Sequence, residues 1–150
     1  MHYLKYIAYI IKHKYYVMLE CIKLGIPLRG VLHDLHKFLP SEFIPYAKYY
    51  YGNANKYKIL EEQMDVAWLK HQNRAKHHWQ YWCLIEEDTA SIKALPMPDK
   101  YRKEMLADWI GAGKATNSKL TTKEWYYANR DYMTLHPATK YWIEQQLVNY

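Results

Sequence analysis

The chain has 150 residues, half of them hydrophobic, and a net charge of +6 with histidine counted as neutral. This length predicts a single domain over residues 1–150 with a buried core, and the chain contains no low-complexity run, internal repeat or linker. The positive charge suits an anionic partner, but the lysines are scattered along the chain and select no particular one.

The first expected helix runs from about Tyr3 to Leu24, and Gly25 follows as its stop. Its apolar run is interrupted by charge and is shorter than the ~20 residues of a membrane span, so we expect neither a span nor a signal peptide. A second helix is expected from about Leu28 to Phe38. The third should begin at Pro40 and Ser41 and end near Gly52 and Asn53.

Helical periodicity continues through the rest of the chain, and no alternating stretch predicts a strand. The remaining helices are expected over Tyr57 to His71, 77–88, 98–110, 121–133 and from Pro137 onward. The polar stretch 72–76 should loosen or break the helical run between the first two of these. An all-α domain of seven or eight helices with no sheet follows.

Cys21 and Cys83 each lie in a stretch that is predicted to be an apolar helix. Their spacing does not match a zinc knuckle or a redox pair, so we expect reduced thiols in the core. With no expected span, this predicts a cytoplasmic protein without a membrane partner.

Eight histidines are the unusual feature of this chain, and acids that could complete a metal site accompany them. Adjacent side chains on a helix point about 100° apart, so His33 and Asp34 could hold one ion between them. The apolar pair Val31-Leu32 before them would anchor the helix in the core. Lys37 follows on nearly the same face, where a substrate phosphate would need a cation.

The segment GVLHDLHKF resembles the HD-x-x-K signature of the HD-domain metal-dependent phosphohydrolases. That superfamily is all-helical and uses a histidine from an earlier helix, the His-Asp pair and an aspartate from a later helix. Some members add one or two histidines between the pair and the last aspartate and hold two metal ions. The resemblance implies metal ligands at His13, His33, Asp34 and Asp108, with His71, His77 and His78 as further candidates.

The whole chain also resembles a small family of bacterial and phage proteins that brings no established activity. The shared segments are LGIPLRGVLHDLHKF, HHWQYW, ADWIGAGKA and LHP. This second resemblance implies the cytoplasm of a bacterium or of a phage-infected host cell.

Each expected ligand also has a structural interpretation. His33 and Asp34 could be a core histidine and a capping aspartate, and His13 could be a half-buried polar residue. Asp108 could pair with a lysine or an arginine. These alternatives stay open at the level of the sequence.

His71 and His78 are seven residues apart, which places them on one face but ~10 Å apart along a continuous helix. They could share one ion only if the chain bends between them, because a metal lies about 2.0–2.1 Å from each ligand. The intervening polar stretch makes a bend plausible. Two ions roughly 3.5–4 Å apart would relax the constraint further.

Further residues are candidates for binding the substrate. They are His36, Lys37, Arg74, Lys76 and Lys114. Arg74 is the preferred phosphate clamp because its planar guanidinium can bind two oxygens at once. Arg29 could also reach the site, and His136 could be a structural cap.

The predicted activity is hydrolysis of a nucleotide or a nucleotide-like phosphate ester. Asp34 would orient the attacking water or accept its proton, and Lys37 and Arg74 would stabilise charge on the phosphoryl oxygens. Mixed histidine and carboxylate ligands favour one or two ions of Mn, Fe, Co, Ni or Zn. The alternative is a non-catalytic module that binds a nucleotide or a nucleic acid, in which a metal only holds helices together. The oligomeric state is left undetermined.

Overall fold

The computed structural model describes residues 1–52 and 58–150. These residues form seven α-helices and one short β-hairpin, so the predicted all-α class is confirmed. The helix boundaries expected at Asn53 and Tyr57 lie outside the described residues. Within the described ranges, no helix is both long enough and apolar enough to cross a membrane.

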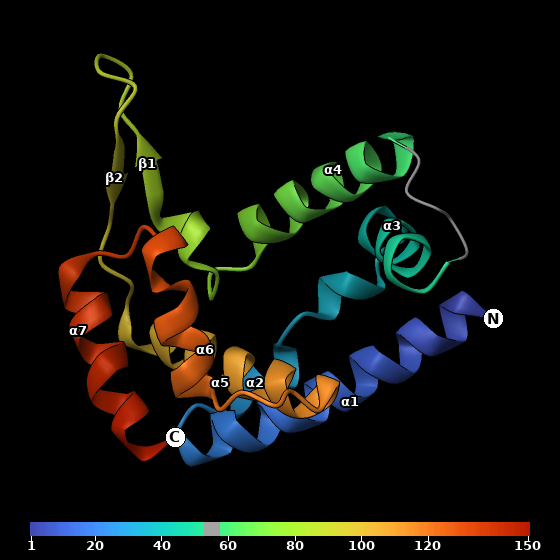
Figure 1. Ribbon diagram of the computed structural model, residues 1–150, viewed down its shortest axis with the longest axis horizontal. Helices are drawn as coiled ribbons and strands as arrows, with labels where there is room; N and C mark the ends of the chain where they lie inside the picture. The colour runs from blue at the N-terminus through green and yellow to red at the C-terminus, as the bar shows by residue number, and fades with distance from the viewer. Residues whose placement is uncertain (53–57) are drawn as a thin grey trace.

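The described helices and strands follow one another along the chain as Figure 1 shows. The α-helices are α1 (His2–Lys23), α2 (Pro27–Leu32), α3 (Pro40–Tyr51), α4 (Lys58–Arg74), α5 (Asp99–Thr116), α6 (Thr122–Asn129) and α7 (Pro137–Gln146). The 3-10 turns are η1 (Leu35–Phe38), η2 (Trp79–Trp82), η3 (Arg130–Tyr132) and η4 (Leu147–Asn149). The strands β1 (Cys83–Ile85) and β2 (Ile92–Ala94) pair antiparallel, with Leu84 opposite Lys93.

Helices α1 and α5 pack against each other along the lower side of the molecule as drawn in Figure 1. The buried residues of α1 recur every three or four positions, as expected for a helix with one face in the core. Gly111 on α5 permits a close approach, because a Cβ there would lie 2.4 Å from Cγ2 of Val17. The two helices that carry His13 and Asp108 therefore form one rigid support.

Two hydrophobic clusters lie on either side of this pair. One cluster joins α5 to α6 and α7 and includes Met105, Tyr126 and Ile143. The other joins α1 to α3 and α4 and includes Tyr6 and Tyr46. The helices α1, α4 and α5, which carry His13, His71 and Asp108, each belong to one of these clusters, so the clusters hold the helices of the site in place.

The prediction of a helix over 77–88 is wrong, because this segment forms a 3-10 turn and then the first strand of a hairpin. Side-chain hydrogen bonds close the hairpin: the Ser91 hydroxyl donates to Glu86, and Ala90 takes a left-handed conformation at φ 52°. Threonine and serine side chains in this loop offer the backbone an alternative to helical bonding. The hairpin projects from the helical body (Figure 1), and Cys83 lies in β1 rather than in a helix. Both cysteines are free.

The second expected helix is also interrupted. Helix α2 ends at Leu32, and the chain turns at His33 and Asp34 before η1 begins. Asp34 has φ 54° and ψ 28°, a left-handed conformation that ends a helix and that aspartate tolerates better than most residues. His33 and Asp34 therefore lie in a turn and not side by side on a helix.

Candidate metal centre

The turn that carries His33 and Asp34 is buried and is fixed by a lysine from α1. The Lys14 ammonium donates to the backbone carbonyls of His33 and Val31. His33 is 1% exposed and Asp34 is 3% exposed. The side chain of His33 reaches His13 on α1 and Asp108 on α5, whereas the carboxylate of Asp34 faces Lys37 and His71.

Four residues from three segments form what we call the first donor group: His13, His33, Asp34 and Asp108. Nε2 of His13 lies 3.3 Å from Nε2 of His33 and 3.0 Å from Oδ1 of Asp108. Nε2 of His33 lies 3.4 Å from Oδ2 of Asp34. Ligands ~2.1 Å from one tetrahedral ion are separated by about 3.4 Å, so these four atoms are close to the spacing that one ion requires.

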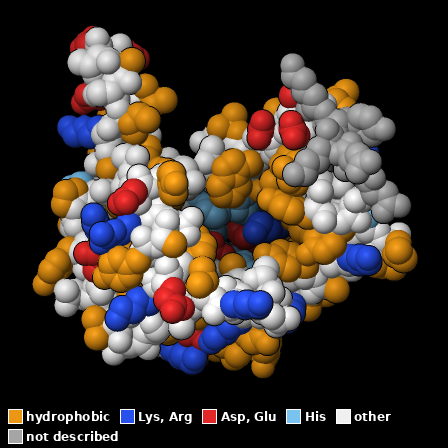
Figure 2. Space-filling view, viewed as in Figure 1, with side chains coloured by type: hydrophobic (Ala, Val, Ile, Leu, Met, Phe, Trp, Pro, Cys, Tyr) orange, Lys and Arg blue, Asp and Glu red, His pale blue; other side chains and the backbone are white. Residues whose placement is uncertain are grey.

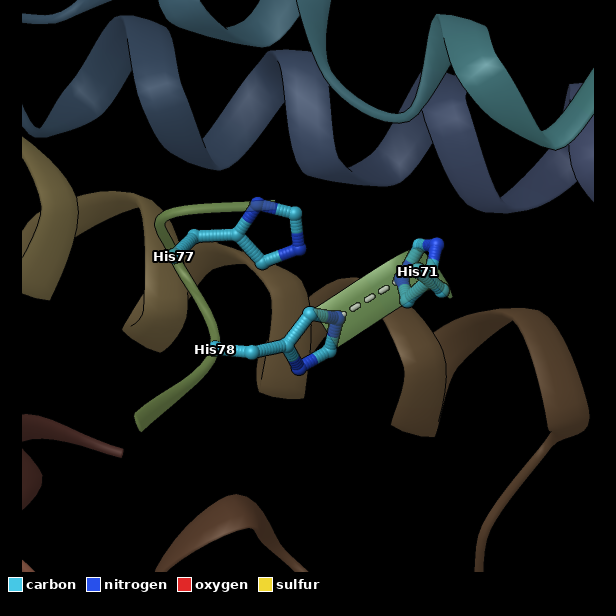
Figure 3. A group of neighbouring side chains, drawn as sticks. All are labelled: His71, His77 and His78. Carbon is cyan, nitrogen blue, oxygen red and sulfur yellow. Dashed lines mark hydrogen bonds between the residues drawn. The ribbon is translucent and has the colours of Figure 1, made fainter. Parts of the chain in front are cut away.

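Two further possible metal-binding groups share His71, namely Asp34, His36 and His71, and His71, His77 and His78, and we call these five residues together the second donor group. Oδ1 of Asp34 lies 3.5 Å from Nε2 of His77, 3.7 Å from Nε2 of His71 and 3.8 Å from Nε2 of His36. Helix α4 ends at Arg74, and the chain bends so that Nε2 of His78 lies 2.8 Å from Nε2 of His71 (Figure 3). The bend that a shared site would require is therefore present.

Asp34 belongs to both groups and contributes one oxygen to each. Its Oδ2 faces His33 and also lies 2.7 Å from the ammonium of Lys37, while its Oδ1 faces the histidines of the second group. Figure 2 shows histidine, acidic and basic side chains together on the floor of a central hollow. The floor of this hollow therefore combines metal-ligating groups with a cation.

Two glutamates orient the imidazoles, and one of them, Glu104, also forms a possible metal-binding group of its own with His33 and His77. Oε1 of Glu104 lies 3.1 Å from Nδ1 of His33 and 3.4 Å from Nδ1 of His77. Oε2 of Glu104 accepts a hydrogen bond from Nε of Arg29 at 2.6 Å. A carboxylate that takes the Nδ1–H of a histidine leaves Nε2 free to bind a metal.

Glu42 repeats this arrangement on the other side. Its Oε2 lies 3.0 Å from Nδ1 of both His36 and His71, and its Oε1 accepts a hydrogen bond from Arg74 at 2.8 Å. Glu42 and Glu104 are both fully buried or nearly so. Four imidazoles are thus held with Nε2 pointing inward, two by each glutamate.

The charges of the site are set by these contacts. Burial opposes ionisation of the carboxyls, but the neighbouring histidines outweigh it and lower the pKa of Glu42 and of Glu104 to about 2 each. The pKa values of Asp34 and Asp108 are lowered for the same reason, with Lys37 contributing at Asp34. Four ionised carboxylates therefore gather in a small buried volume.

The histidines divide into two kinds. Burial lowers the pKa values of His13, His71 and His78, so their imidazoles are neutral at pH 7 and have a nitrogen lone pair to offer. Burial acts in the same direction at His33, but Asp34, Asp108 and Glu104 outweigh it and raise the pKa to about 9. The extra proton of His33 is one that a cation at its Nε2 would displace.

The residues present fit a divalent metal ion. Oδ1 of Asp34 and Nε2 of His77 are buried and have no hydrogen-bond partner within the described part of the chain. Unpartnered buried polar atoms are costly, and both of these are metal-ligand types. The structure therefore contains buried clusters of histidine and carboxylate that could bind a metal.

Not every predicted substrate contact lies at the site. His36 and Lys37 do, since both approach Asp34. Arg74 pairs with Glu42, and the ammonium of the exposed Lys76 lies over the ring of Tyr81. The ammonium of Lys114 lies 2.6 Å from Glu20 on α1, so it is directed to that ion pair and away from the donor groups. The positive charge of each of these three side chains is therefore directed to a protein carboxylate or an aromatic ring, where we had expected a substrate phosphate.

His136 is a structural residue, because its Nδ1 accepts a hydrogen bond from the backbone N–H of Ala138 and caps α7. Glu42 and Glu104 are the site residues that the sequence analysis missed. Glu104 lies four residues before Asp108 and thus on the same helical face, which is a usable signal. Glu42 offers no such signal in the sequence.

Comparisons with known proteins add a family but no activity. A model described as "Family of unknown function (DUF5662)" matches residues 2–149. No curated protein and no solved structure matches the chain.

Proposed function

Because the chain belongs to a family of unknown function (DUF5662), we propose its activity from the site itself. The proposal is a divalent-metal-dependent phosphohydrolase of the HD type that acts on a nucleotide or a nucleotide-like phosphate ester. The observation that carries it is Asp34, whose two oxygens face two groups of imidazole nitrogens while Lys37 lies beside it. A carboxylate between two donor groups, with a cation at hand, suits two-metal hydrolysis of a phosphate ester.

The first donor group would hold one ion, and the histidines of the second group would hold another. Mixed imidazole and carboxylate donors favour Mn²⁺, Fe²⁺, Co²⁺, Ni²⁺ or Zn²⁺ over Mg²⁺ or Ca²⁺. A bound divalent ion supplies a Lewis acid that polarises the phosphoryl oxygen and lowers the pKa of a bound water.

The side chains around the ions have separate roles in this proposal. Lys37 binds a phosphoryl oxygen through its ammonium and stabilises the charge that develops there. Asp34 is ionised and lies where it can orient the attacking water or accept its proton. Arg74 acts by holding Glu42 in place, which replaces the expected role of a phosphate clamp.

The test begins with protein freed of metal by a chelator and then supplied with Mn²⁺, Co²⁺ or Ni²⁺. We expect phosphate release from some member of a nucleotide panel, and elemental analysis should find one or two ions per chain. Asp34→Asn should abolish both, because asparagine tolerates the left-handed turn but lacks the charge. Asp65→Asn on the exposed face of α4 is the matched control and should change neither.

Two results would contradict this function. A protein that binds no transition metal under these conditions has no metal centre. A protein that binds metal through Asp34 but hydrolyses nothing in the panel would instead be the metal-stabilised binding module, and the catalytic proposal would be wrong.

A further inference from the structure

A cavity of about 400 Å³ adjoins the candidate metal centre and is lined mainly by tyrosines. Its lining includes Tyr6, Tyr9, Tyr46, Tyr50, Tyr51 and Lys37. The tyrosines come from α1 and α3, so two helices present aromatic rings to one space. The cavity lies at the lower end of the 300–1,000 Å³ that is usual for small-molecule sites.

Lys37 connects this cavity to the metal centre. Its ammonium lies 2.7 Å from Oδ2 of Asp34, while its side chain forms part of the cavity wall. A phosphate bound at the donor groups and at Lys37 would therefore have its organic part directed along the tyrosines. Figure 2 shows side chains of the hydrophobic class, which includes tyrosine, at the margin of the hollow beside the basic side chain on its floor.

Two of the tyrosines carry a hydroxyl that lacks a partner. Tyr6 is 1% exposed and Tyr46 is 7% exposed, and neither hydroxyl has a hydrogen-bond partner among residues 1–52 and 58–150. Burial raises the pKa of both phenols, so they stay protonated and can donate as well as accept. A buried hydroxyl without a partner is costly, and a water or a bound molecule in the adjoining cavity would supply the partner.

The rings themselves favour a flat occupant. The rings of Tyr6 and Tyr46 are nearly parallel, with centroids 6.0 Å apart and an interplanar angle of 4°, and Tyr50 stacks on Tyr46 at 6.1 Å. Because these rings already stack on one another, a planar occupant of the cavity would contact their free faces and edges rather than lie between them.

The chemistry of the lining selects among possible occupants. A cationic ligand would suit an aromatic cage, but the ammonium of Lys37 repels it. An apolar chain would leave the hydroxyls of Tyr6 and Tyr46 without partners. A planar, uncharged heterocycle with hydrogen-bonding edges satisfies both the rings and the hydroxyls.

A second cavity, of about 310 Å³, reaches the centre at His78 and Asp108 and is lined by tryptophans such as Trp109 and Trp125. No lysine or arginine is found in its described lining, so a phosphate that entered from this side would meet no cation there. Trp109 and Trp125 also pack against the core of α5, α6 and α7. This cavity is therefore the weaker candidate for a nucleotide.

We propose that the tyrosine-lined cavity binds the base of a mononucleotide whose phosphate lies at Lys37 and the donor groups. This inference rests on the proposed function for the position of the phosphate, and it adds the substrate class. The base lies in the cavity against the tyrosine rings of its wall, and the hydroxyls of Tyr6 and Tyr46 hydrogen-bond to it directly or through water.

The test compares ligands with and without a base, in binding and in turnover. Mn²⁺-loaded protein is titrated calorimetrically with AMP, GMP, CMP and UMP, and with ribose 5-phosphate as the ligand that lacks a base. The variant is Tyr6→Phe combined with Tyr46→Phe, which removes only the two hydroxyls. Tyr141→Phe on the exposed face of α7 is the matched control.

We expect at least one nucleoside monophosphate to bind more tightly than ribose 5-phosphate. The double variant should lose about tenfold in affinity for that nucleotide, since two hydrogen bonds are removed. Its affinity for ribose 5-phosphate and its melting temperature should not fall, and Tyr141→Phe should match the wild type.

Equal nucleotide affinity in the double variant and the wild type would overturn the assignment of the cavity. So would equal losses for AMP-type ligands and for ribose 5-phosphate, or the absence of binding by all four nucleotides. If the tyrosine-dependent binding is found but phosphate is not released, the cavity assignment stands and only the hydrolytic activity is wrong.

Discussion

At the scale of single residues, each of two buried glutamates contacts the Nδ1 atoms of two histidines and is itself paired with one arginine. Glu104 accepts a hydrogen bond from Nδ1 of His33, lies 3.4 Å from Nδ1 of His77 and is itself held by Arg29. The orientation of both imidazoles therefore depends on a residue that is not itself in either donor group. Such outer partners are worth ten- to a hundredfold in metal affinity.

Glu104→Gln should lower the affinity for Mn²⁺ by about 10- to 100-fold while the helical content stays unchanged. A neutral amide cannot accept from two imidazoles as strongly as a carboxylate, so His33 and His77 lose their fixed orientation. Competition with a calibrated chelator measures the affinity, and circular dichroism checks the fold. Glu62→Gln, on an exposed position of α4, is the control. An unchanged affinity in Glu104→Gln would show that the glutamate has no part in metal binding.

Glu20 is a second buried carboxylate, and it lies outside the metal site. Its Oε1 accepts hydrogen bonds from Lys114 at 2.6 Å and from Lys23 at 2.9 Å. Burial alone would raise the pKa of Glu20, but these two lysines outweigh burial and lower it. Because the folded state binds this proton more weakly than the unfolded chain, the pairs stabilise the fold above the ordinary glutamate pKa of ~4.3.

Glu20→Gln should therefore reduce the free energy of unfolding by about 1 kcal/mol at pH 7, since both lysines are largely solvated and the pairs are partly screened. The difference between wild type and variant should shrink as the pH falls below ~4.3 and through the lower folded-state pKa. Urea unfolding of both proteins at pH 7 and pH 4 measures it. A difference that grows on acidification would mean that the sign of the Glu20 contribution is reversed.

The sequence could predict the site residues that carry a recognisable pattern. His33, Asp34 and Lys37 lie within five residues of one another, and His13 and Asp108 follow from the order of the motif. Glu42 was not predictable, because its role depends on contacts to His71 and Arg74 about thirty residues away in sequence. The ion pair of Lys114 was not predictable for the same reason, since only the packing of α5 on α1 brings it to Glu20.

At the scale of helices, substitution by alanine is expected to have opposite effects on stability at two glycines of α5. A Cβ at Gly111 would lie 2.4 Å from Cγ2 of Val17 and 3.0 Å from its backbone nitrogen, so α1 and α5 would have to separate. A Cβ at Gly113 would meet nothing nearer than 3.9 Å. The same substitution can therefore be made at a closely packed site and at an open site of one helix.

Gly111→Ala should destabilise the protein by about 1–3 kcal/mol and weaken metal binding, because overpacking displaces the helices that carry His13 and Asp108. Gly113→Ala should stabilise it by about 0.5–1 kcal/mol, since alanine is the better helix former and has room. Urea unfolding curves of both variants and of the wild type measure these changes in the free energy of unfolding. Equal effects of the two substitutions would show that helices α1 and α5 are not in close contact at Gly111.

The helices themselves were predicted well, and the errors have one physical origin. The helix expected over 77–88 was replaced by a hairpin, and the helix over Leu28 to Phe38 was broken at His33 and Asp34. In both places polar side chains or a left-handed residue satisfy the backbone locally, which periodicity of apolar residues does not report. These two irregular segments carry or border the site residues His33, Asp34 and His78.

At the scale of the whole molecule, the donor groups draw on residues from position 13 to position 108. The helices that carry them belong to two hydrophobic clusters, that of α1, α3 and α4 and that of α5, α6 and α7. Glu42, Glu104 and Asp34 are paired at the site with Arg74, Arg29 and Lys37, but Oδ1 of Asp34 and Nε2 of His77 have no hydrogen-bond partner within the described part of the chain. A divalent ion would supply that partner and link the helices that carry the donor groups, so metal binding should be coupled to folding.

Saturating Mn²⁺ should therefore raise the melting temperature of the metal-free protein. At a free concentration one hundred times the dissociation constant, a single ion contributes about 2.7 kcal/mol. For a chain of this length that corresponds to a rise of about 5–10 °C. Differential scanning calorimetry with and without the ion measures the shift, and a chelator should reverse it. Asp34→Asn should show almost no rise, because this substitution removes the carboxylate that both donor groups share. A melting temperature that rises equally in Asp34→Asn and in the wild type would place the ion elsewhere on the protein.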